Sequence, residues 1–497
     1  MMLYIRMFLI MGVSLITFRL LLQQLGEVDY GIYNVVGGVV ILFSFLNSAM
    51  MQSSQRFFSY YIGNGDEPML RKMFAASIWI HLGIALVVVA LAETVGLWFL
   101  NRYMSFPPGS MTAVNIVYQC TIVTFLIQIM IVPHQSMIIS QESMSFFAYL
   151  SIAEVILKLS AVLILMLFSS GKLVVYGIAL VVVSTVIATF YRLYCIRKFQ
   201  VCREGLHYDK ESVRRIASFS GWNTLGGIGN VGASQGVNVV FNVFCGVVVN
   251  AAMGVANQVL AAVGSFVSNF QTAFNPQIIK LYASGEIREF DNLIFRASRI
   301  SFCLIFILGF PIIILAEPIM SLWLTVLPPY SVRFTQLVII VCMLDAISGP
   351  LWTAAQACGK IKNYMIIISL LIFSNVPAAI VILWCGLSPV WVIGYRIFAN
   401  MTIHLFRIIY LHRNISFPAW EYIRTCMIPI AILVLVALPL AIFMNVMLPD
   451  SILIKILEFI LLLIECTGLT YIILLKKEER IFLREKISLL VRKLHSK

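Results

Sequence analysis

Fourteen long apolar stretches, separated by short polar gaps, constrain the fold of this chain more than any other feature. A helix of about 20 apolar residues crosses the roughly 30 Å hydrocarbon core of a bilayer. At 61% hydrophobic and 11% charged residues, the chain has too much apolar surface to stay dry as a soluble globule. We therefore predict transmembrane helices over residues 2–22, 31–55, 74–100, 111–133, 146–169, 173–191, 216–243, 251–278, 300–316, 334–356, 363–385, 388–406, 425–448 and 452–475.

The predicted fold class is an all-α integral membrane protein. The apolar stretches are too continuous for the strands of a membrane barrel, which alternate apolar and polar residues with a period of two. Helices also satisfy their backbone hydrogen bonds internally, as the hydrocarbon core requires.

The 35 Lys and Arg residues are distributed unevenly between the two alternating sets of gaps. One set contains most of them, and the other contains only Arg102, Lys172, Arg333 and Lys455. Loops rich in Lys and Arg stay in the cytoplasm, so this asymmetry predicts a multi-pass protein with both termini cytoplasmic. The net charge is +13, and the basic residues lie beside the spans, where anionic headgroups attract them. We therefore expect membrane lipids, and no nucleic acid, as partners.

The sequence contains no pattern of catalytic, metal-binding or cofactor-binding residues. Its ten Cys residues lack the CxxC or Cys/His spacing of a zinc or disulfide framework. There is no GxxxxGK[ST] motif, no GxGxxG between a strand and a helix, and no Ser/His/Asp cluster in a soluble segment. We expect no enzyme activity, no metal and no cofactor. The first stretch lacks a small-residue cleavage site, so we expect a retained span.

The longest polar gap, around residues 192–215, divides the spans after the sixth and is typical of an interlobe linker. The last two spans fall outside two sets of six and are interpreted as an accessory pair. The tail alternates apolar with basic residues, as in a helix on an anionic membrane surface. The predicted segments are an N-terminal lobe 1–194, a cytoplasmic linker 195–213, a C-terminal lobe 214–415, accessory helices 416–475 and a cytoplasmic tail 476–497.

A faint internal echo relates the two halves. Residues 44–45 (SF) correspond to residues 265–266, and the turn at 63–66 (GNGD) corresponds to 284–286 (SGE). Parallel six-helix repeats are one transporter architecture, and coincidence between two apolar helices is the other interpretation.

The seventh stretch is crowded with glycines and amides. Amides at membrane depth need a partner or water, so this helix either lines a wet cavity or packs in a seam with its amides bonded between helices. The predicted cavity-lining amides are Asn223, Asn230, Gln235 and Asn238.

Burying an ionisable side chain in the hydrocarbon costs free energy, so each such residue is expected to pair with another group or to serve a function. Lys158 follows Glu154 by four residues, the favoured spacing for an ion pair on one helix face, whereas Arg396 has no carboxylate in its own span. Arg6 and Arg19 lie near opposite ends of the first stretch, where long side chains can reach the interface.

Proton or cation coupling would require a titratable group inside the membrane. The candidates for this role are His81, Glu93, Glu154 and Asp345. Hydrogen-bonded helix packing is the alternative role for each of them.

Three segments resemble the bacterial polysaccharide flippases of the multidrug/oligosaccharidyl-lipid/polysaccharide exporter superfamily. They are residues 25–34 (LGEVDYGIYN), 219–223 (FSGWN) and 268–277 (SNFQTAFNPQ), the last followed by Tyr282. The resemblance extends over the whole chain and identifies packing and turn signatures rather than a substrate. It also supports a true repeat as the source of the internal echo.

The resemblance implies two six-helix lobes in a V around a central cavity, in a bacterial inner membrane. It further implies alternating access for a lipid-linked oligosaccharide, with a polysaccharide polymerase or glycosyltransferases as possible partners. Cationic side chains would bind the diphosphate that joins lipid to glycan. The residues expected in this role are Arg6, Arg19, Arg56, Lys158 and Arg396.

We therefore expect a flippase that moves polyprenyl-diphosphate-linked oligosaccharide to the periplasmic leaflet for surface polysaccharide synthesis. One alternative is a cation-coupled multidrug exporter of the same superfamily, which would favour acidic groups in the cavity. Another is a membrane enzyme or scaffold that acts on lipid-linked sugars without moving them.

Overall fold

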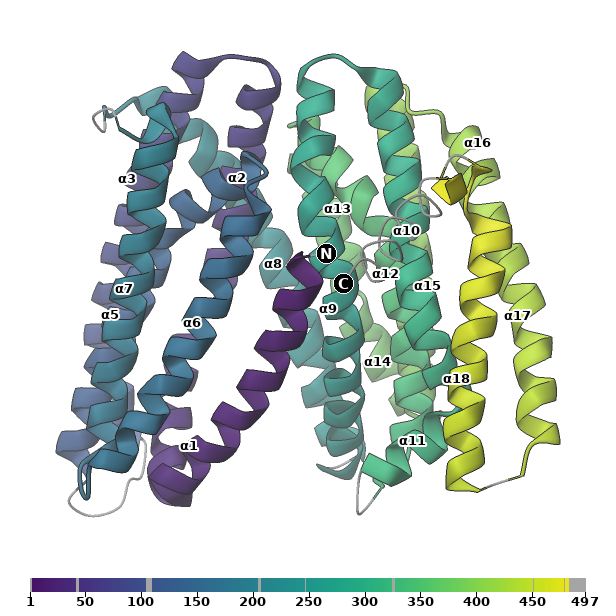
Figure 1. Ribbon diagram of the computed structural model, residues 1–497, viewed down its shortest axis with the longest axis horizontal. Coiled ribbons are helices and arrows are strands. Elements are labelled where there is room, and N and C mark those ends of the chain that lie inside the picture. Colours follow the sequence, from purple (N-terminus) through teal and green to yellow (C-terminus); the bar gives the residue numbers. More distant parts are fainter. Residues whose placement is uncertain are drawn as a thin grey trace, which may run out of the picture. The chain divides into compact units, whose positions relative to one another are not determined.

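The computed structural model describes residues 2–41, 44–103, 110–203, 207–245, 247–323, 327–449, 451–477 and 479–481. Regular structure in these ranges is helical, with no strand among them (Figure 1). The predicted all-α membrane fold is confirmed, with 14 long helices in the part of the chain that the structure describes. Within the described ranges, nine helical segments are long and apolar enough to cross a membrane. Most of the predicted tail, from residue 482 onward, lies outside the described residues.

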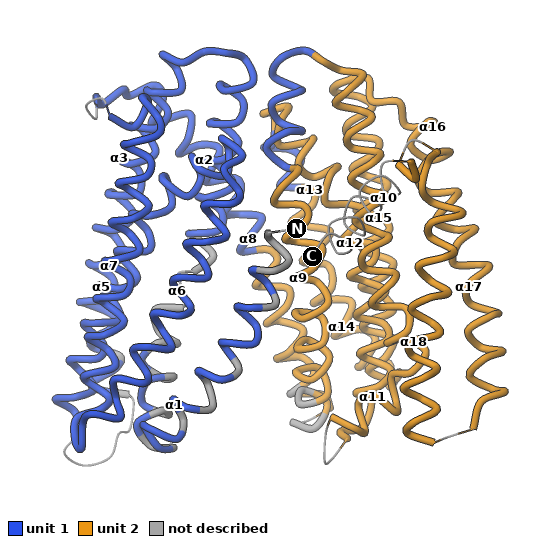
Figure 2. Tube along the Cα trace, in the orientation of Figure 1, with its two compact units in different colours: residues 1–228, 275–285, 361–366 blue, residues 229–274, 286–360, 367–497 orange. Residues whose placement is uncertain are grey.

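The chain forms two compact units (Figure 2). Unit 1 comprises residues 1–228, 275–285 and 361–366, and unit 2 comprises residues 229–274, 286–360 and 367–497. Three long helices therefore contribute residues to both units: α8 (Lys210–Cys245), α9 (Val247–Ala283) and α13 (Lys362–Phe373). The predicted domain boundaries remain a prediction.

Unit 1 is built mainly from the first helices of the chain. In it, α5 packs along α7, α1 along α6, and α2 along α5. These helices bury a core that includes Tyr118, Ile129 and Val162. Its helices are α1 (Met2–Ile41), α2 (Ser44–Gly63), α3 (Glu67–Leu91), α4 (Leu97–Tyr103), α5 (Met111–Ser140), α6 (Met144–Ile164) and α7 (Lys172–Lys198).

Left-handed glycines interrupt or end several helices of the chain. Gly26 interrupts α1 with a φ of 77°, which glycine adopts without the steric cost of a side chain. The two turns that echo each other in sequence also share a left-handed glycine, with φ of 69° at Gly65 and 78° at Gly285. Asp66 then begins α3 by accepting a hydrogen bond from the Met69 N–H at 3.0 Å.

The last residues of α9 pack within unit 1 against the end of α2 and the turn after α5. Glu142, in that turn, has a left-handed φ of 57°. Its carboxylate accepts hydrogen bonds from Lys280 Nζ at 2.6 Å and Gln277 Nε2 at 3.0 Å. Gly63 lies so near the backbone of Lys280 that a Cβ atom there would be 2.5 Å from the Lys280 carbonyl oxygen. The end of α9 is thus held by a charge pair and a close helix contact.

Acid should weaken the Glu142 contact. Burial raises the pKa of the Glu142 carboxyl, but the hydrogen bonds from Lys280 and Gln277 and the Lys280 charge outweigh it, so the pKa is lowered. A depressed pKa stabilises the fold above the unfolded pKa of about 4.3, and this stability is lost as the pH falls through the folded pKa. We expect the difference in thermal midpoint between wild type and Glu142→Gln to shrink below about pH 4. A difference independent of pH would contradict this assignment.

Unit 2 contains the remaining helices. In it, α10 and α15 both pack on α12, and the last helix, α18, packs on α10 and α17. Besides its parts of α8, α9 and α13, the unit contains α10 (Ile287–Ile314), α11 (Ala316–Trp323), α12 (Ser331–Ala357), α14 (Asn375–Trp384), α15 (Val390–Ile415), α16 (Ala419–Tyr422), α17 (Ile428–Met447) and α18 (Ile452–Leu469).

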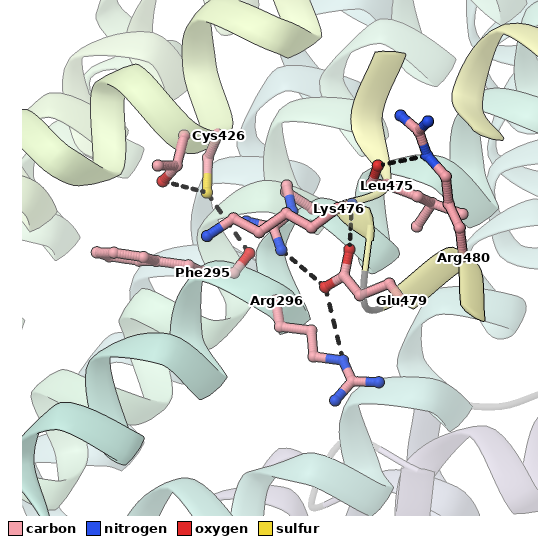
Figure 3. Close-up of polar contacts among 9 residues, drawn as sticks. Phe295, Arg296, Cys426, Leu475, Lys476, Glu479 and Arg480 are labelled. Atoms are coloured by element: carbon pink, nitrogen blue, oxygen red, sulfur yellow. Dashed lines mark hydrogen bonds and ion pairs between the residues drawn. The ribbon is translucent and has the colours of Figure 1, made fainter. Parts of the chain in front are cut away.

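A buried carboxylate attaches the segment after α18 to α10. Glu479, 8% exposed, accepts a hydrogen bond from the buried Arg299 at 2.7 Å and lies 3.6 Å from the half-exposed Arg296. Its other oxygen accepts the backbone N–H of Lys476 at 2.9 Å (Figure 3). Arg480 donates to the Leu475 carbonyl oxygen beside it. One acidic side chain therefore joins two segments 180 residues apart.

Two helices continue past the apolar stretches from which their spans were predicted. α10 begins at Ile287 rather than near residue 300, and α15 ends at Ile415 rather than near residue 406. Both extensions contain arginines, which lower the local hydropathy without ending the helix. Arg299 and Arg407 therefore lie inside helices of unit 2, although both are outside the predicted spans 300–316 and 388–406.

Candidate functional site: a charged cavity in unit 2

A polar cavity of about 200 Å³ lies within unit 2. Two arginines and one carboxylate are its charged lining groups, and several amides complete the polar surface. The polar lining residues are Asn230, Ser234, Asn238, Asp345, Asn375, Arg396, Asn400 and Arg407. The formal charge of this lining is therefore positive.

One face of α15 supplies the basic side of the cavity. Arg396, Asn400, Ile403 and Arg407 are spaced by three or four residues, so they lie on one side of the helix. Asn230, Ser234 and Asn238 follow the same spacing on α8. Both helices thus present a polar face to the cavity.

Asp345 of α12 is the acidic group of the lining. Its carboxylate accepts a hydrogen bond from Asn400 Nδ2 at 3.2 Å, and it interacts electrostatically with Arg396 and Arg407. Arg407 also donates to the Ser348 carbonyl oxygen at 3.2 Å. Within the described ranges, Arg396 forms no hydrogen bond or ion pair, so its guanidinium is available to a ligand.

A helix break places Asn375 in the cavity. α13 ends at Phe373 and α14 begins at Asn375, with Ser374 between them. Pro377 follows in the first turn of α14, where its missing N–H removes the bond that a continuous helix would make. The Asn375 amide donates to the Ile372 carbonyl oxygen at 2.7 Å, and its buried Oδ1 has no partner among the described residues. This acceptor and the guanidinium of Arg396 are two polar groups that a bound molecule could satisfy.

The structure does not gather the predicted diphosphate ligands in this cavity. Arg396 lines it, whereas the other four belong to unit 1. Arg6 is stacked over Phe147 at 4.7 Å, and Lys158 forms the ion pair with Glu154, 2.7 Å long, that its spacing predicts. The side chain of Arg19 is outside the described part of the structure.

Arg56, the remaining predicted ligand, is 8% exposed. Its guanidinium lies over the rings of Phe57, Tyr60 and Phe219, at 4.7 to 5.3 Å from their centroids. These cation–π contacts stabilise the Arg56 guanidinium, and Arg56 does not line the unit 2 cavity.

The predicted coupling residues also have separate environments. His81 is fully buried, with Nδ1 2.6 Å from the Ser77 carbonyl oxygen, and Glu93 accepts a hydrogen bond from Gln119 at 3.1 Å. Glu154 lines a second cavity, in unit 1, and Asp345 lines the cavity of unit 2.

Of the predicted lining amides, Asn230 and Asn238 line the unit 2 cavity. Gln235 accepts a hydrogen bond from Asn238 at 3.5 Å, and Asn223 is buried in unit 1, where it donates to Ser53 Oγ at 3.1 Å. Both interpretations of the seventh stretch therefore apply: Asn230 and Asn238 line a cavity, and Asn223 is packed with its amide hydrogen-bonded to another helix.

Sequence reasoning missed Arg407, Asn375 and Asn400. The spacing of Arg396, Asn400 and Arg407 was a usable signal, because it places all three on one helix face. Because hydropathy ended the predicted span at residue 406, Arg407 was left outside the helix whose spacing it continues. Nothing local indicated Asn375, whose position depends on the break at Ser374.

The sequence matches no family model and no curated protein sequence. The structure is similar to that of an outward-facing multidrug resistance MATE family transporter of the MOP superfamily, with a TM-score of 0.69, 12% identity, and coverage of 84% of this chain and 95% of the other. A MOP superfamily transporter from Pyrococcus furiosus, described as having a binding pocket of reverse polarity, matches with a TM-score of 0.69, 13% identity and the same coverages. A Vibrio cholerae MATE transporter matches with a TM-score of 0.65, 16% identity, and coverage of 84% and 96%. The chain therefore has the fold of these membrane transporters.

Proposed function

We propose that this protein is a membrane transporter whose unit 2 cavity receives the anionic part of an amphiphilic substrate. The transporter fold supports the first half of this proposal. The anionic substrate is supported by the charge of the cavity lining, in which two arginines, Arg396 and Arg407, face one carboxylate, Asp345. A dehydrated anion needs charged donors of this kind.

The finer assignment is a lipid-linked oligosaccharide, moved between leaflets with its diphosphate at Arg396. The cavity is smaller than the roughly 300–1,000 Å³ typical of whole-ligand pockets, so it suits one polar group of a larger molecule. The three segments that resemble polysaccharide flippases support the same substrate class.

Transport of lipid-linked glycan by purified protein in liposomes tests this assignment. Replacing Arg396 with Gln should slow the rate at which protected glycan becomes accessible to an outside probe by about ten- to hundredfold, because a charge-assisted hydrogen bond contributes about 1.5–3 kcal/mol. Arg413→Gln is the matched control, since Arg413 is exposed on the same helix and does not line the cavity. Equal transport rates for wild type and Arg396→Gln would contradict the proposal that Arg396 binds the anionic group of the substrate.

A cation-coupled multidrug exporter is the second candidate, and the comparisons favour it because solved multidrug transporters share the fold. In that case Asp345, rather than Arg396, would be the decisive group. Efflux of a cationic dye driven by a sodium or proton gradient would then be abolished in Asp345→Asn and kept in Arg396→Gln. The opposite pattern supports the anionic substrate.

A further inference from the structure

A second cavity, of about 320 Å³, lies within unit 1. Four helices supply its lining. On α2, α5 and α7 the lining residues are adjacent or three or four positions apart, so they share one face of each helix, and α6 supplies one residue. The lining residues are Asn47, Ser48 and Met51 of α2, Gln128, Ile131, Val132 and Gln135 of α5, Glu154 of α6, and Ser184 and Ile187 of α7.

Several polar groups in this lining are left for a ligand or water. Asn47, Ser48, Gln128 and Ser184 make no side-chain hydrogen bond to any residue in the described part of the chain. Gln135, by contrast, is bonded to Tyr191. Amides and hydroxyls inside a membrane protein need a hydrogen-bonding partner, so this cavity does not suit a purely apolar group.

The charge of the lining disfavours an ionic ligand. Among the described lining residues, Glu154 alone is ionisable, and its Oε1 accepts a hydrogen bond from Lys158 Nζ at 2.7 Å. Arg6 is electrostatically near Glu154 but is stacked over Phe147 and does not line the cavity. A cation would meet a carboxylate already neutralised, and an anion would meet that carboxylate without a free positive partner.

We propose that this cavity binds a neutral, hydroxyl-rich group, namely a sugar unit of the transported substrate. Amides offer two donors and an acceptor, and Ser hydroxyls both donate and accept, which matches the hydroxyls of a sugar. The volume equals about ten water molecules at roughly 30 Å³ each, enough for one monosaccharide unit. None of the described lining residues is aromatic, so they provide no stacking surface of the kind that an aromatic drug would use.

This inference rests on the proposed transport of a lipid-linked sugar, and binding by purified full-length protein tests it separately from transport. The probes are radiolabelled methyl glycosides of neutral hexoses, deoxyhexoses and N-acetylhexosamines, with inorganic pyrophosphate as the ionic comparison. At least one glycoside should bind to wild type. Gln128→Leu, which replaces the amide with an apolar side chain, should weaken its binding by about five- to tenfold, the effect of a lost hydrogen bond.

Matched variants separate this site from its surroundings. Ser184→Ala should also weaken glycoside binding, whereas Thr185→Val should not, because Thr185 is the exposed neighbour on α7 and bonds the Val181 carbonyl oxygen. Arg396→Gln should reduce pyrophosphate binding and leave glycoside binding unchanged. Gln128→Leu should show the reverse.

Two results would overturn the sugar site: no glycoside of the panel binds to wild type, which leaves a water-filled cavity, or Gln128→Leu and Ser184→Ala bind as wild type does. If glycoside binding follows the predicted variants but liposomes show no transport, the proposed function fails and the binding site stands. If transport depends on Arg396 while no glycoside binds, the site fails and the function stands.

Discussion

Replacing Glu479 with Ala should destabilise unit 2 by about 3–5 kcal/mol, the cost of leaving a buried charge without its partner. Arg299 is 2% exposed, and Glu479 is its anionic partner at 2.7 Å. The same substitution removes the hydrogen bond to the Lys476 N–H, which orients the segment after α18. Titration with SDS of the purified protein measures the loss, and faster proteolysis after α18 would accompany it.

Controls on the same cluster define the mechanism. Arg296→Gln should change the unfolding free energy by less than about 1 kcal/mol, because Arg296 is 45% exposed and lies 3.6 Å from the carboxylate. Glu289→Ala, an exposed acid on α10, should be close to neutral. Replacing both partners, Glu479→Leu with Arg299→Met, should recover most of the loss, because apolar side chains of similar volume leave no buried charge. Equal stability of Glu479→Ala and Glu289→Ala would contradict the assignment.

The second large effect is expected at the contact between α2 and the end of α9. Gly63→Val should destabilise unit 1 by about 1–3 kcal/mol or more, as overpacking does in a tight core. Its Cβ would be 2.5 Å from the Lys280 carbonyl oxygen and 2.6 Å from the Lys280 Cα. Both are backbone atoms, so the helices must separate, which also lengthens the pairing of Lys280 with Glu142.

Gly83→Ala is the matched control for Gly63. Gly83 lies within α3, and a Cβ there would have no atom within 4 Å. Alanine in a helix is favoured over glycine by roughly 0.5–1 kcal/mol, so this variant should be neutral or slightly more stable. Thermal midpoints of the two variants in one detergent provide the comparison. If Gly63→Val unfolds at the wild-type midpoint, the close approach of α2 and α9 is wrong.

The pairing of Lys158 with Glu154 shows how far local sequence could be used. Their spacing of four residues fixes them on one helix face, whatever the rest of the fold does. The face of α15 that lines the unit 2 cavity is local in the same sense, and only a hydropathy boundary hid Arg407 from it. Candidate site residues on one helix could thus be found from periodicity alone.

Residues whose partners come from distant segments could not be interpreted in this way. The family resemblance implied that Arg56 binds an anion, yet the ring of Phe219 helps to enclose it. Glu479 belonged to a segment that we interpreted as a surface tail, and its partner Arg299 to a predicted loop. No local pattern distinguishes a buried partner from an exposed charge, because burial depends on which helices pack together.

The sequence by itself determined that this is an all-helical membrane protein, since only about 20 consecutive apolar residues per helix can satisfy the hydrocarbon core. It also determined which residues share a face of one helix. Only the tertiary structure decided that Arg396, Arg407, Asp345 and Asn375 line one cavity, and that Glu154 lines another among neutral amides. The physical reason is that helix periodicity follows from the backbone, whereas a cavity forms where side chains from several helices, far apart in sequence, leave space between them.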